Sequence, residues 1–264
     1  MIAVKQFFKI IVPRPVLNFF SGFFYGWSGN YQSWDEALKK SNGYDSPSIL
    51  EIIRASALKV RDGEFQYERD SAVFNSIQYS FPLLAGLMWI AARNNGCINI
   101  LDFGGSLGSS YFQNRRFLDS LANVNWCIVE QPALVKCGID DFQNRNLHFF
   151  YSVQDCINTY NINVCVLSSV LQYLEKPYEK LDEIISTGVR FIIIDRTPFI
   201  KGKNKITIQI VHPAIYKAKY PCWFFNESEF RDYMGINFNC LLEFDALDRA
   251  NIKSEFKGYL FERK

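Results

Sequence analysis

The stretch from Asn99 to Asn114 reads Asn-Ile-Leu-Asp-Phe-Gly-Gly-Ser-Leu-Gly-Ser-Ser-Tyr-Phe-Gln-Asn and decides the fold. A short apolar run stops at three glycines, Gly104, Gly105 and Gly108, and apolar residues at helical spacing follow. This order predicts a buried strand, a tight turn and the start of a helix. Glycine suits the turn because the missing Cβ permits positive φ and close approach to a ligand, and the helix start offers unpaired N–H groups.

Two classes of ligand use such a turn. Dinucleotides require glycine at the first, third and sixth positions of the loop. The requirement is not met if the first position is Gly104, and it is not met if the first position is Gly105. The order Asp102, Gly104, Gly108 is instead similar to the D-x-G-x-G-x-G loop of class I S-adenosylmethionine (SAM) methyltransferases, with Ser106 in place of the middle glycine. The structural alternative is an ordinary strand–turn–helix of an α/β protein.

Composition limits the function classes. The chain has 264 residues, 48% of them hydrophobic, which is enough for a sizeable core, and its formal net charge of +2 predicts no nucleic-acid partner. The seven cysteines form no C-x-x-C pair, and they fit a reducing, cytoplasmic location. With only two histidines, His148 and His212, neither near clustered ligands, no metal site is predicted.

The N-terminal residues 1–30 are aromatic and basic. Val4, Phe7, Phe8 and Ile11 share one helical face, whereas prolines interrupt the pattern and no apolar run is long enough for a transmembrane helix. The segment also lacks the cleavage site of a secretory signal. Two interpretations stay open for residues 1–27. They bind peripherally at the inner face of a membrane, or they pack on their own domain or on a second copy in a homo-oligomer.

Three regions are expected: residues 1–30, a helical cap over 31–96 and a ligand-binding domain over 97–264. From Ile98 onward strands alternate with helices, which predicts a doubly wound parallel sheet. A final helix and two more strands predict a closing antiparallel pair, which is typical of methyltransferases. The expected strands are Ile98–Phe103, Trp126–Glu130, Leu147–Tyr151, Val164–Ser168, Phe191–Asp195, Phe238–Phe244 and Lys257–Glu262, and the expected helices cover about 111–121, 133–142, 153–160, 178–186 and 227–234.

Polar residues at the strand ends are the candidate cofactor ligands, because parallel strands bring their carboxyl ends to one edge. Glu130 closes the second strand and is placed to accept hydrogen bonds from ribose hydroxyls, and Gln131 follows it. Ser152 follows the third strand, near the expected adenine position, although it is equally suited to cap the next helix with Asp155 in the first turn. Ser168 and Ser169 follow the fourth strand and suit either the methionine end of SAM or a helix cap.

Two residues are candidates for acid–base catalysis. Asp195 ends the fifth strand and is placed to activate an acceptor hydroxyl, or else simply pairs with Arg196. His212 lies beyond that strand, where a neutral imidazole would accept a proton, although a lone histidine is also a common structural residue. The aromatic residues of 216–225 suit stacking on a sugar ring or plain core packing.

Five strings carry a resemblance to a family of SAM-dependent methyltransferases associated with surface-polysaccharide biosynthesis in bacteria. The resemblance extends from about Trp34 to the end of the chain. By it, Gly104, Gly105 and Glu130 hold SAM, and Ser106 is the family's own usage. The strings are Tyr67-Glu68-Arg69-Asp70, residues 101–113, Val129-Glu130-Gln131-Pro132, residues 167–174 and Ile194-Asp195-Arg196-Thr197-Pro198-Phe199.

These observations together predict a class I SAM methyltransferase that methylates a sugar hydroxyl of a glycan or its activated precursor and releases S-adenosylhomocysteine (SAH). Arg69 and Asp70 are expected to fold over the site, with Arg69 holding the cofactor. Two other functions stay open. One is a nicotinamide-dependent sugar-modifying enzyme, against which the glycine spacing argues. The other is a membrane-docked scaffold that keeps the fold without catalysis.

Overall fold

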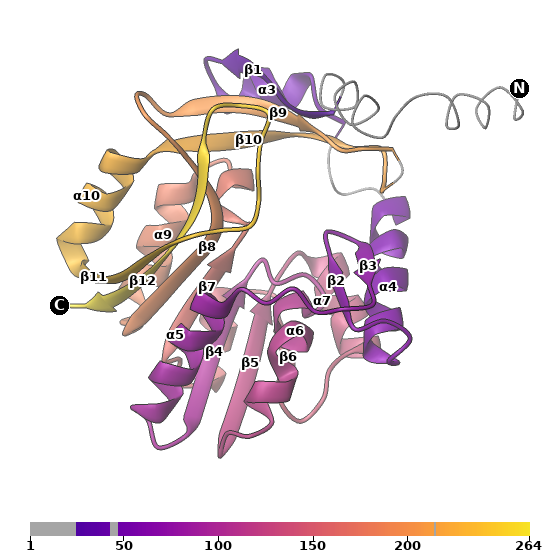
Figure 1. The fold of residues 1–264 in the computed structure, drawn as a ribbon, viewed down its shortest axis with the longest axis vertical. Coiled ribbons are helices and arrows are strands. Elements are labelled where there is room, and N and C mark those ends of the chain that lie inside the picture. Colours follow the sequence, from indigo (N-terminus) through magenta and orange to yellow (C-terminus); the bar gives the residue numbers. More distant parts are fainter. Residues whose placement is uncertain (1–24, 43–46, 214) are drawn as a thin grey trace, which may run out of the picture.

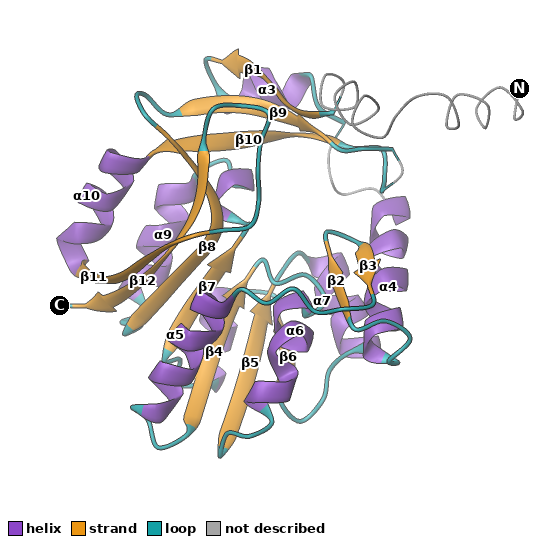
Figure 2. Cartoon of the chain, viewed as in Figure 1, coloured by secondary structure: helices purple, strands orange, loops and turns teal. Residues whose placement is uncertain are grey.

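The computed structural model describes residues 25–42, 47–213 and 215–264. Within these ranges, ten strands form one sheet and two short strands form a separate hairpin (Figures 1 and 2). The amphipathic segment predicted to contact a membrane or a partner falls almost wholly within residues 1–24. It therefore lies outside the described residues, and that prediction stays a prediction.

The centre of the sheet consists of five parallel strands in the order β6-β5-β4-β7-β8. Each was expected from an apolar run followed by polar or turn-forming residues, and each is present. Only the last is markedly longer than predicted, because it continues past Asp195. The strands are β4 (Cys97–Phe103), β5 (Asn123–Val129), β6 (Leu147–Phe150), β7 (Val164–Ser168) and β8 (Phe191–Ile200).

Helices cover both faces of this sheet. One face packs on α4 (Pro47–Arg61), α5 (Phe81–Ala92), α6 (Ser109–Leu118) and α7 (Pro132–Asp141). The other packs on α8 (Val153–Thr159), α9 (Pro177–Ser186) and α10 (Glu227–Asn237). The alternation of side chains along a strand explains the division, since Ile98 and Ile100 enter the first core layer and Leu101 enters the second.

Two antiparallel strands close the sheet beyond β8. β12 (Glu255–Arg263) pairs with β8, and β11 (Phe238–Asp245) pairs with β12. The register with β12 leaves Asp195 and Arg196 of β8 opposite the single residue Gly258, which is a β-bulge. Bulges redirect side chains and are frequent beside functional sites. The predicted doubly wound sheet with a closing antiparallel pair is therefore confirmed.

An antiparallel extension, here called the arm, was not predicted. It consists of β1 (Gly26–Tyr31), β9 (Lys205–Ile210) and β10 (Lys219–Asn226), and β10 joins the main sheet through a short parallel pairing with the end of β8. Figure 1 shows the arm above the parallel strands. The aromatic stretch at 219–225 is thus a strand.

The region expected to be helical, 31–96, contains further β structure. α3 (Trp34–Lys39) is a helix, as expected for this region, and the Ser33 side chain accepts the Glu36 N–H, but β2 (Tyr67–Arg69) and β3 (Ala72–Phe74) form a hairpin. Neither this hairpin nor β1 has a run of alternating apolar residues. Their pairing partners, rather than local propensity, decide their conformation.

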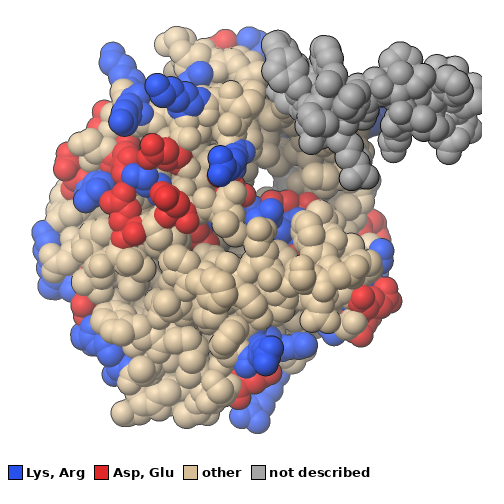
Figure 3. Space-filling model, viewed as in Figure 1, with Lys and Arg blue, Asp and Glu red and all other residues tan. Residues whose placement is uncertain are grey.

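Charges of both signs are mixed on the face of the molecule that Figure 3 shows. Figure 3 shows acidic and basic side chains together over α10, β11 and β12, where Lys257 lies between Glu227 and Glu243. All seven cysteines are free. Among the described residues no helix has the length and apolarity needed to cross a bilayer, and no group of three His, Cys, Asp or Glu side chains is arranged to hold a metal ion.

Candidate functional site

A cavity of about 1090 Å³ lies at the carboxyl ends of the parallel strands, below the arm. Figure 3 shows an opening between the arm and the rest of the molecule on this side. Every residue predicted for the site lines this one cavity. They are Arg69, Asp102, Gly104, Gly105, Ser106, Glu130, Gln131, Ser152, Ser168, Ser169, Asp195 and His212.

The glycine loop follows β4 and requires glycine at two positions. Gly104 has a φ of +75°, and a Cβ there would lie 2.4 Å from Cγ2 of Val170. A Cβ on Gly105 would lie 2.4 Å from Oδ2 of Asp102. Ser106, in the place of the middle glycine, nevertheless adopts the left-handed conformation at φ +53°. The loop thus keeps the glycine-type backbone at a serine, at a conformational cost of roughly 1–2 kcal/mol.

Asp102 supports this loop from below. Its side chain is 1% exposed, and it accepts a hydrogen bond from Trp126 Nε1 at 2.8 Å. Burial raises the pKa of Asp102 to about 7, and the Trp126 hydrogen bond opposes this shift. The structure therefore brings Asp102, predicted as a cofactor ligand, to the cavity as a buried group next to Gly105.

Glu130 joins the ends of two strands. Its Oε1 accepts the Ser106 N–H at 3.2 Å, and its Oε2 accepts the Gln131 N–H at 2.7 Å. The carboxylate is therefore oriented by the glycine loop on one side and by its own turn on the other. The hydrogen bond to Ser106 joins two motifs that lie 24 residues apart in the sequence.

The serines at the strand ends have defined structural partners. Ser152 caps α8, since its Oγ accepts the Asp155 N–H at 3.1 Å, as the alternative interpretation expected. Ser169 has a φ of +56°, and its N–H donates to the Asp195 carbonyl at 3.0 Å. Gln172 then links two left-handed residues, because its Nε2 donates to Ser169 Oγ at 3.2 Å and to the Arg196 carbonyl at 3.1 Å.

Asp195 lies in the bulge of β8 and is 2% exposed. Burial raises the pKa of Asp195 to about 6, against the opposing effects of the Arg196 charge and a hydrogen bond from the Ser80 side chain. Its Oδ1 accepts the Arg196 backbone N–H at 2.9 Å. The expected alternative, an ion pair with the Arg196 side chain, is not the contact formed, because that side chain turns to other carboxylates.

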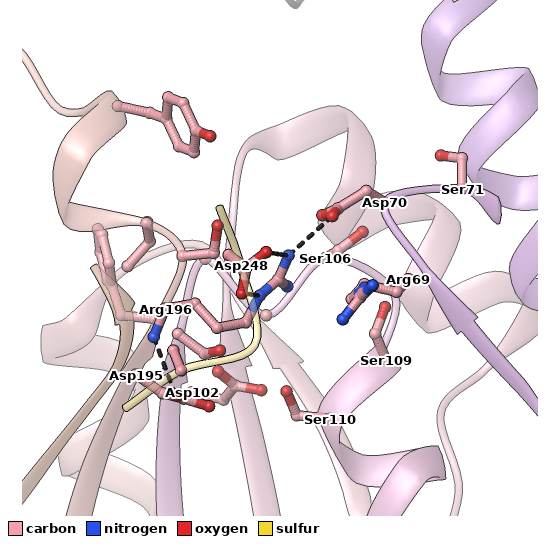
Figure 4. Close-up of a pocket in the computed structure, with 18 of the residues that line it drawn as sticks. Arg69, Asp70, Ser71, Asp102, Ser106, Ser109, Ser110, Asp195, Arg196 and Asp248 are labelled. Atoms are coloured by element: carbon pink, nitrogen blue, oxygen red, sulfur yellow. Dashed lines mark hydrogen bonds and ion pairs between the residues drawn. The ribbon is translucent and has the colours of Figure 1, made fainter. Parts of the chain in front are cut away.

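Arg196 binds two carboxylates from distant segments (Figure 4). Its Nε and Nη2 contact both oxygens of Asp248 at 2.9 and 3.0 Å, and Nη2 also contacts Asp70 Oδ2 at 2.7 Å. These contacts join the β2–β3 hairpin, the end of β8 and the loop before β12. Arg196 and Asp248 were not among the predicted site residues, because no local pattern indicates that segments 52 and 126 residues away meet there.

The hairpin is held against α6 by a buried carboxylate. Glu68 is 7% exposed, accepts the Ser71 N–H at 3.1 Å and accepts a hydrogen bond from the Ser109 hydroxyl. Burial raises the pKa of Glu68, against the effect of the Ser109 bond. Arg69 consequently lies at the cavity, and Figure 4 shows its guanidinium turned toward the start of α6. The expectation that Arg69 and Asp70 reach the site agrees with their positions.

His212 lies at the exposed side of the cavity. Its ring packs on Tyr25, with ring centroids 4.5 Å apart. Tyrosines extend inward from this position. Tyr173 donates to Gln209 Oε1 at 2.7 Å, and its ring meets that of Tyr220 edge to face at 5.3 Å. The aromatic residues predicted to stack on a sugar are thus divided between the cavity wall and the core.

Strained backbone gathers at this cavity. Among the described residues six that are not glycine have positive φ, and all but Asn95 line the cavity. Such conformations cost of order 1–3 kcal/mol each and are concentrated at functional sites. The five are Asp70, Ser71, Ser106, Ser169 and Arg196.

The strand order β6-β5-β4-β7-β8-β12-β11, with β12 reversed and helices on both faces, is the fold of class I SAM-dependent methyltransferases. The glycine loop after β4 and the acidic residue after β5 lie at the carboxyl edge, where such sheets bind their ligands. No protein-family model matches the sequence, and the search of curated proteins found no relative.

Solved structures of similar fold include methyltransferases with bound SAM or SAH. The N-terminal domain of EvdMO1 with SAH and D-fucose aligns at a TM-score of 0.49 and 11% identity, over 81% of this chain and 96% of that one. Magnesium protoporphyrin IX methyltransferase of Synechocystis PCC 6803 with SAH aligns at 0.48 and 12%, over 84% and 96%. CalS10, a SAM-bound amino pentose methyltransferase of Micromonospora echinaspora, aligns at 0.44 and 9%, over 71% and 92%.

Proposed function

We propose that this protein is a SAM-dependent methyltransferase that methylates a sugar hydroxyl of a surface glycan or its precursor. The observation that carries the proposal is the hydrogen bond from the Ser106 N–H to Glu130 at the wall of the cavity. It joins the glycine loop to an oriented carboxylate that suits ribose hydroxyls. An adenosyl compound needs these two groups together.

The residues present fit SAM. The loop 104–108 and Glu130 would hold the nucleoside, with Gln131 and Ser152 beside it. Arg69, which has no ion pair with any other residue that the structure describes, would bind the carboxylate of the methionine end. When bound, SAM supplies a methyl group on a sulfonium centre, which passes to an acceptor oxygen and leaves SAH.

Asp195 would take the proton of the acceptor hydroxyl. A base with a pKa of about 6 is ionised at pH 7 and is more basic than an ordinary aspartate. The bulge in β8 places this carboxylate in the cavity rather than in the sheet. His212, at the exposed side, is the second candidate base. Most of the acceleration would come from aligning the acceptor with the methyl group.

Two features support a sugar acceptor in a bacterial glycan. Tyrosine rings line the part of the cavity next to the arm, and aromatic faces pack well on sugar rings. The five strings that resemble methyltransferases of polysaccharide biosynthesis include the loop, Glu130 and Asp195.

The seven free cysteines fit a cytoplasmic location.

Calorimetric titration with SAH, SAM and NAD tests the cofactor. We expect SAH and SAM to bind and NAD not to bind. Glu130→Gln should weaken SAH binding about 10- to 100-fold, because a hydrogen bond to a charged group contributes about 1.5–3 kcal/mol. The exposed Glu64→Gln is the matched control and should bind as the wild type does. Binding of NAD without binding of SAH or SAM would favour the nicotinamide-dependent enzyme. Binding of none of the three compounds would favour the scaffold without catalysis.

A further inference from the structure

The part of the cavity around Arg196 carries several carboxylates. It is formed by the tip of the β2–β3 hairpin, the bulge of β8 and the loop after β11. Four carboxylates line this part of the cavity, those of Asp70, Asp195, Asp248 and Asp245, the last residue of β11. Two of them, Asp70 and Asp248, contact the guanidinium of Arg196. The proposed acceptor base is one of the four, so this part of the cavity is where the acceptor would bind.

The charge of Arg196 is already neutralised. Three contacts of 2.7 to 3.0 Å join it to Asp70 and Asp248, and only 20% of its side chain is exposed (Figure 4). A phosphate group entering this part of the cavity would have to displace one of the two carboxylates and then lie beside the other. Like charges at such separations repel strongly in a partly buried site.

The neutral groups of the cavity suit a different ligand. Burial raises the pKa of Tyr67 to about 12, and it raises the pKa values of Tyr173, Tyr216 and Tyr220 above their usual value. All four therefore keep their phenolic hydrogens at physiological pH. Tyr173 donates to Gln209, and Tyr216 is hydrogen-bonded to Tyr220, so these residues form a neutral, hydrogen-bonded aromatic lining. This chemistry recognises an uncharged ring that carries several hydroxyls.

We infer that the acceptor binds as an uncharged saccharide, and that nucleoside diphosphate sugars and sugar phosphates are excluded. The inference rests on the proposed function and narrows it. It also orders the reactions. A glycosyl donor carries a phosphate-linked leaving group, which glycosyl transfer releases, so this methylation would follow a reaction of that class, which supplies its substrate.

Matched acceptor pairs test the inference. SAH release from SAM is measured with methyl glycosides of hexoses and 6-deoxyhexoses, with the corresponding sugar 1-phosphates and with the corresponding nucleoside diphosphate sugars. We expect kcat/KM to be at least tenfold higher for the methyl glycosides. The reverse preference would overturn the inference. A protein that binds SAH but prefers phosphate-bearing acceptors fails the inference alone, whereas one that binds no SAH fails the proposed function.

If no acceptor in the panel is methylated, a binding measurement tests whether phosphate groups are excluded from the cavity. SAH-loaded wild-type protein is titrated with inorganic pyrophosphate and with uridine diphosphate, and we expect no binding up to 1 mM of either probe, a concentration of about the Kd of a very weak site. Submillimolar binding to the wild type would overturn the inference.

A variant that removes the negative charges beside Arg196 should gain affinity for pyrophosphate. The double variant Asp70→Asn/Asp248→Asn frees the guanidinium and should bind pyrophosphate at least tenfold more tightly than the wild type. Asp232→Asn, an exposed aspartate outside the cavity, is the matched control and should show no gain. Failure of the double variant to gain affinity would refute the excluding role of the two carboxylates.

Discussion

Replacing Gly105 with alanine tests the packing that shapes the glycine loop. The added Cβ would lie 2.4 Å from Asp102 Oδ2 and 2.5 Å from its Cγ, whereas ordinary contacts begin at 3.4 Å. Asp102 cannot yield easily, because it is 1% exposed and accepts the Trp126 Nε1 hydrogen bond at 2.8 Å. The variant must therefore break that bond or displace the loop.

Both routes have a similar cost. Overpacking a tight site costs about 1–3 kcal/mol, and losing a hydrogen bond to a buried charged group costs about 1.5–3 kcal/mol. We expect a loss of about 2 kcal/mol in the free energy of unfolding, which for a chain of this size lowers Tm by about 4–8 °C. If the loop moves instead, SAH affinity should fall about tenfold or more, since each 1.4 kcal/mol is about a factor of ten.

The assays are thermal unfolding and calorimetric titration with SAH. Gly235→Ala is the matched control, because a Cβ there meets no atom within 4 Å, and alanine in α10 should raise stability by about 0.5–1 kcal/mol. In an Asp102→Ala background the Gly105→Ala cost should fall below about 0.5 kcal/mol, because the colliding carboxylate is gone. A Gly105→Ala protein with wild-type Tm and wild-type SAH affinity would refute this reasoning.

Three further substitutions test the contacts around Asp195 and Arg196. Asp195→Asn should remove the rise in kcat that the wild type shows through about pH 6, and an unchanged pH profile of kcat would contradict the assignment. Burial raises the pKa of Asp195 in the folded protein, so the stability that its protonated form contributes is lost as the pH rises through about 6. The Tm of the variant should therefore exceed that of the wild type by more at pH 8 than at pH 5. Gln172→Met should lower kcat about tenfold, because it removes the hydrogen bonds to the left-handed residues Ser169 and Arg196. The Tm should change little, because the variant also removes the Gln172 Oε1, which is buried with no partner among the described residues. Wild-type kinetics would exclude a positioning role. A lysine at position 196 cannot reproduce the planar contact with Asp248 and also reach Asp70. Arg196→Lys should therefore lower the free energy of chemical unfolding by about 1–3 kcal/mol. A loss below about 0.5 kcal/mol, the size expected for an exposed ion pair, would show that the three-way contact is weak.

The parts of the site that the sequence predicted are those encoded locally. The loop from Asp102 to Gly108 follows an apolar strand directly, and its glycines are required by contacts with Asp102 and Val170. Glu130 is identifiable because it ends the next strand and parallel strands share an edge. For the same reason all the predicted polar strand ends meet at one cavity.

The parts that were missed depend on long-range pairing. β1 contains two glycines and no apolar alternation, and its conformation depends on antiparallel pairing with β9. Arg196 has no charged neighbour at helical or strand spacing that indicates Asp248, 52 residues away, as its partner. A signal did exist in Asp195 and Arg196, since two adjacent charged residues interrupt a strand that is otherwise uncharged, and bulges are frequent beside functional sites.

A crystal structure of the protein with SAH tests the central claim most directly. We predict the adenosyl group against residues 104–108 with the ribose hydroxyls on Glu130, and the sulfur between that loop and Asp195. SAH bound elsewhere, or a ribose that makes no contact with Glu130 in crystals grown at saturating SAH, would contradict the account.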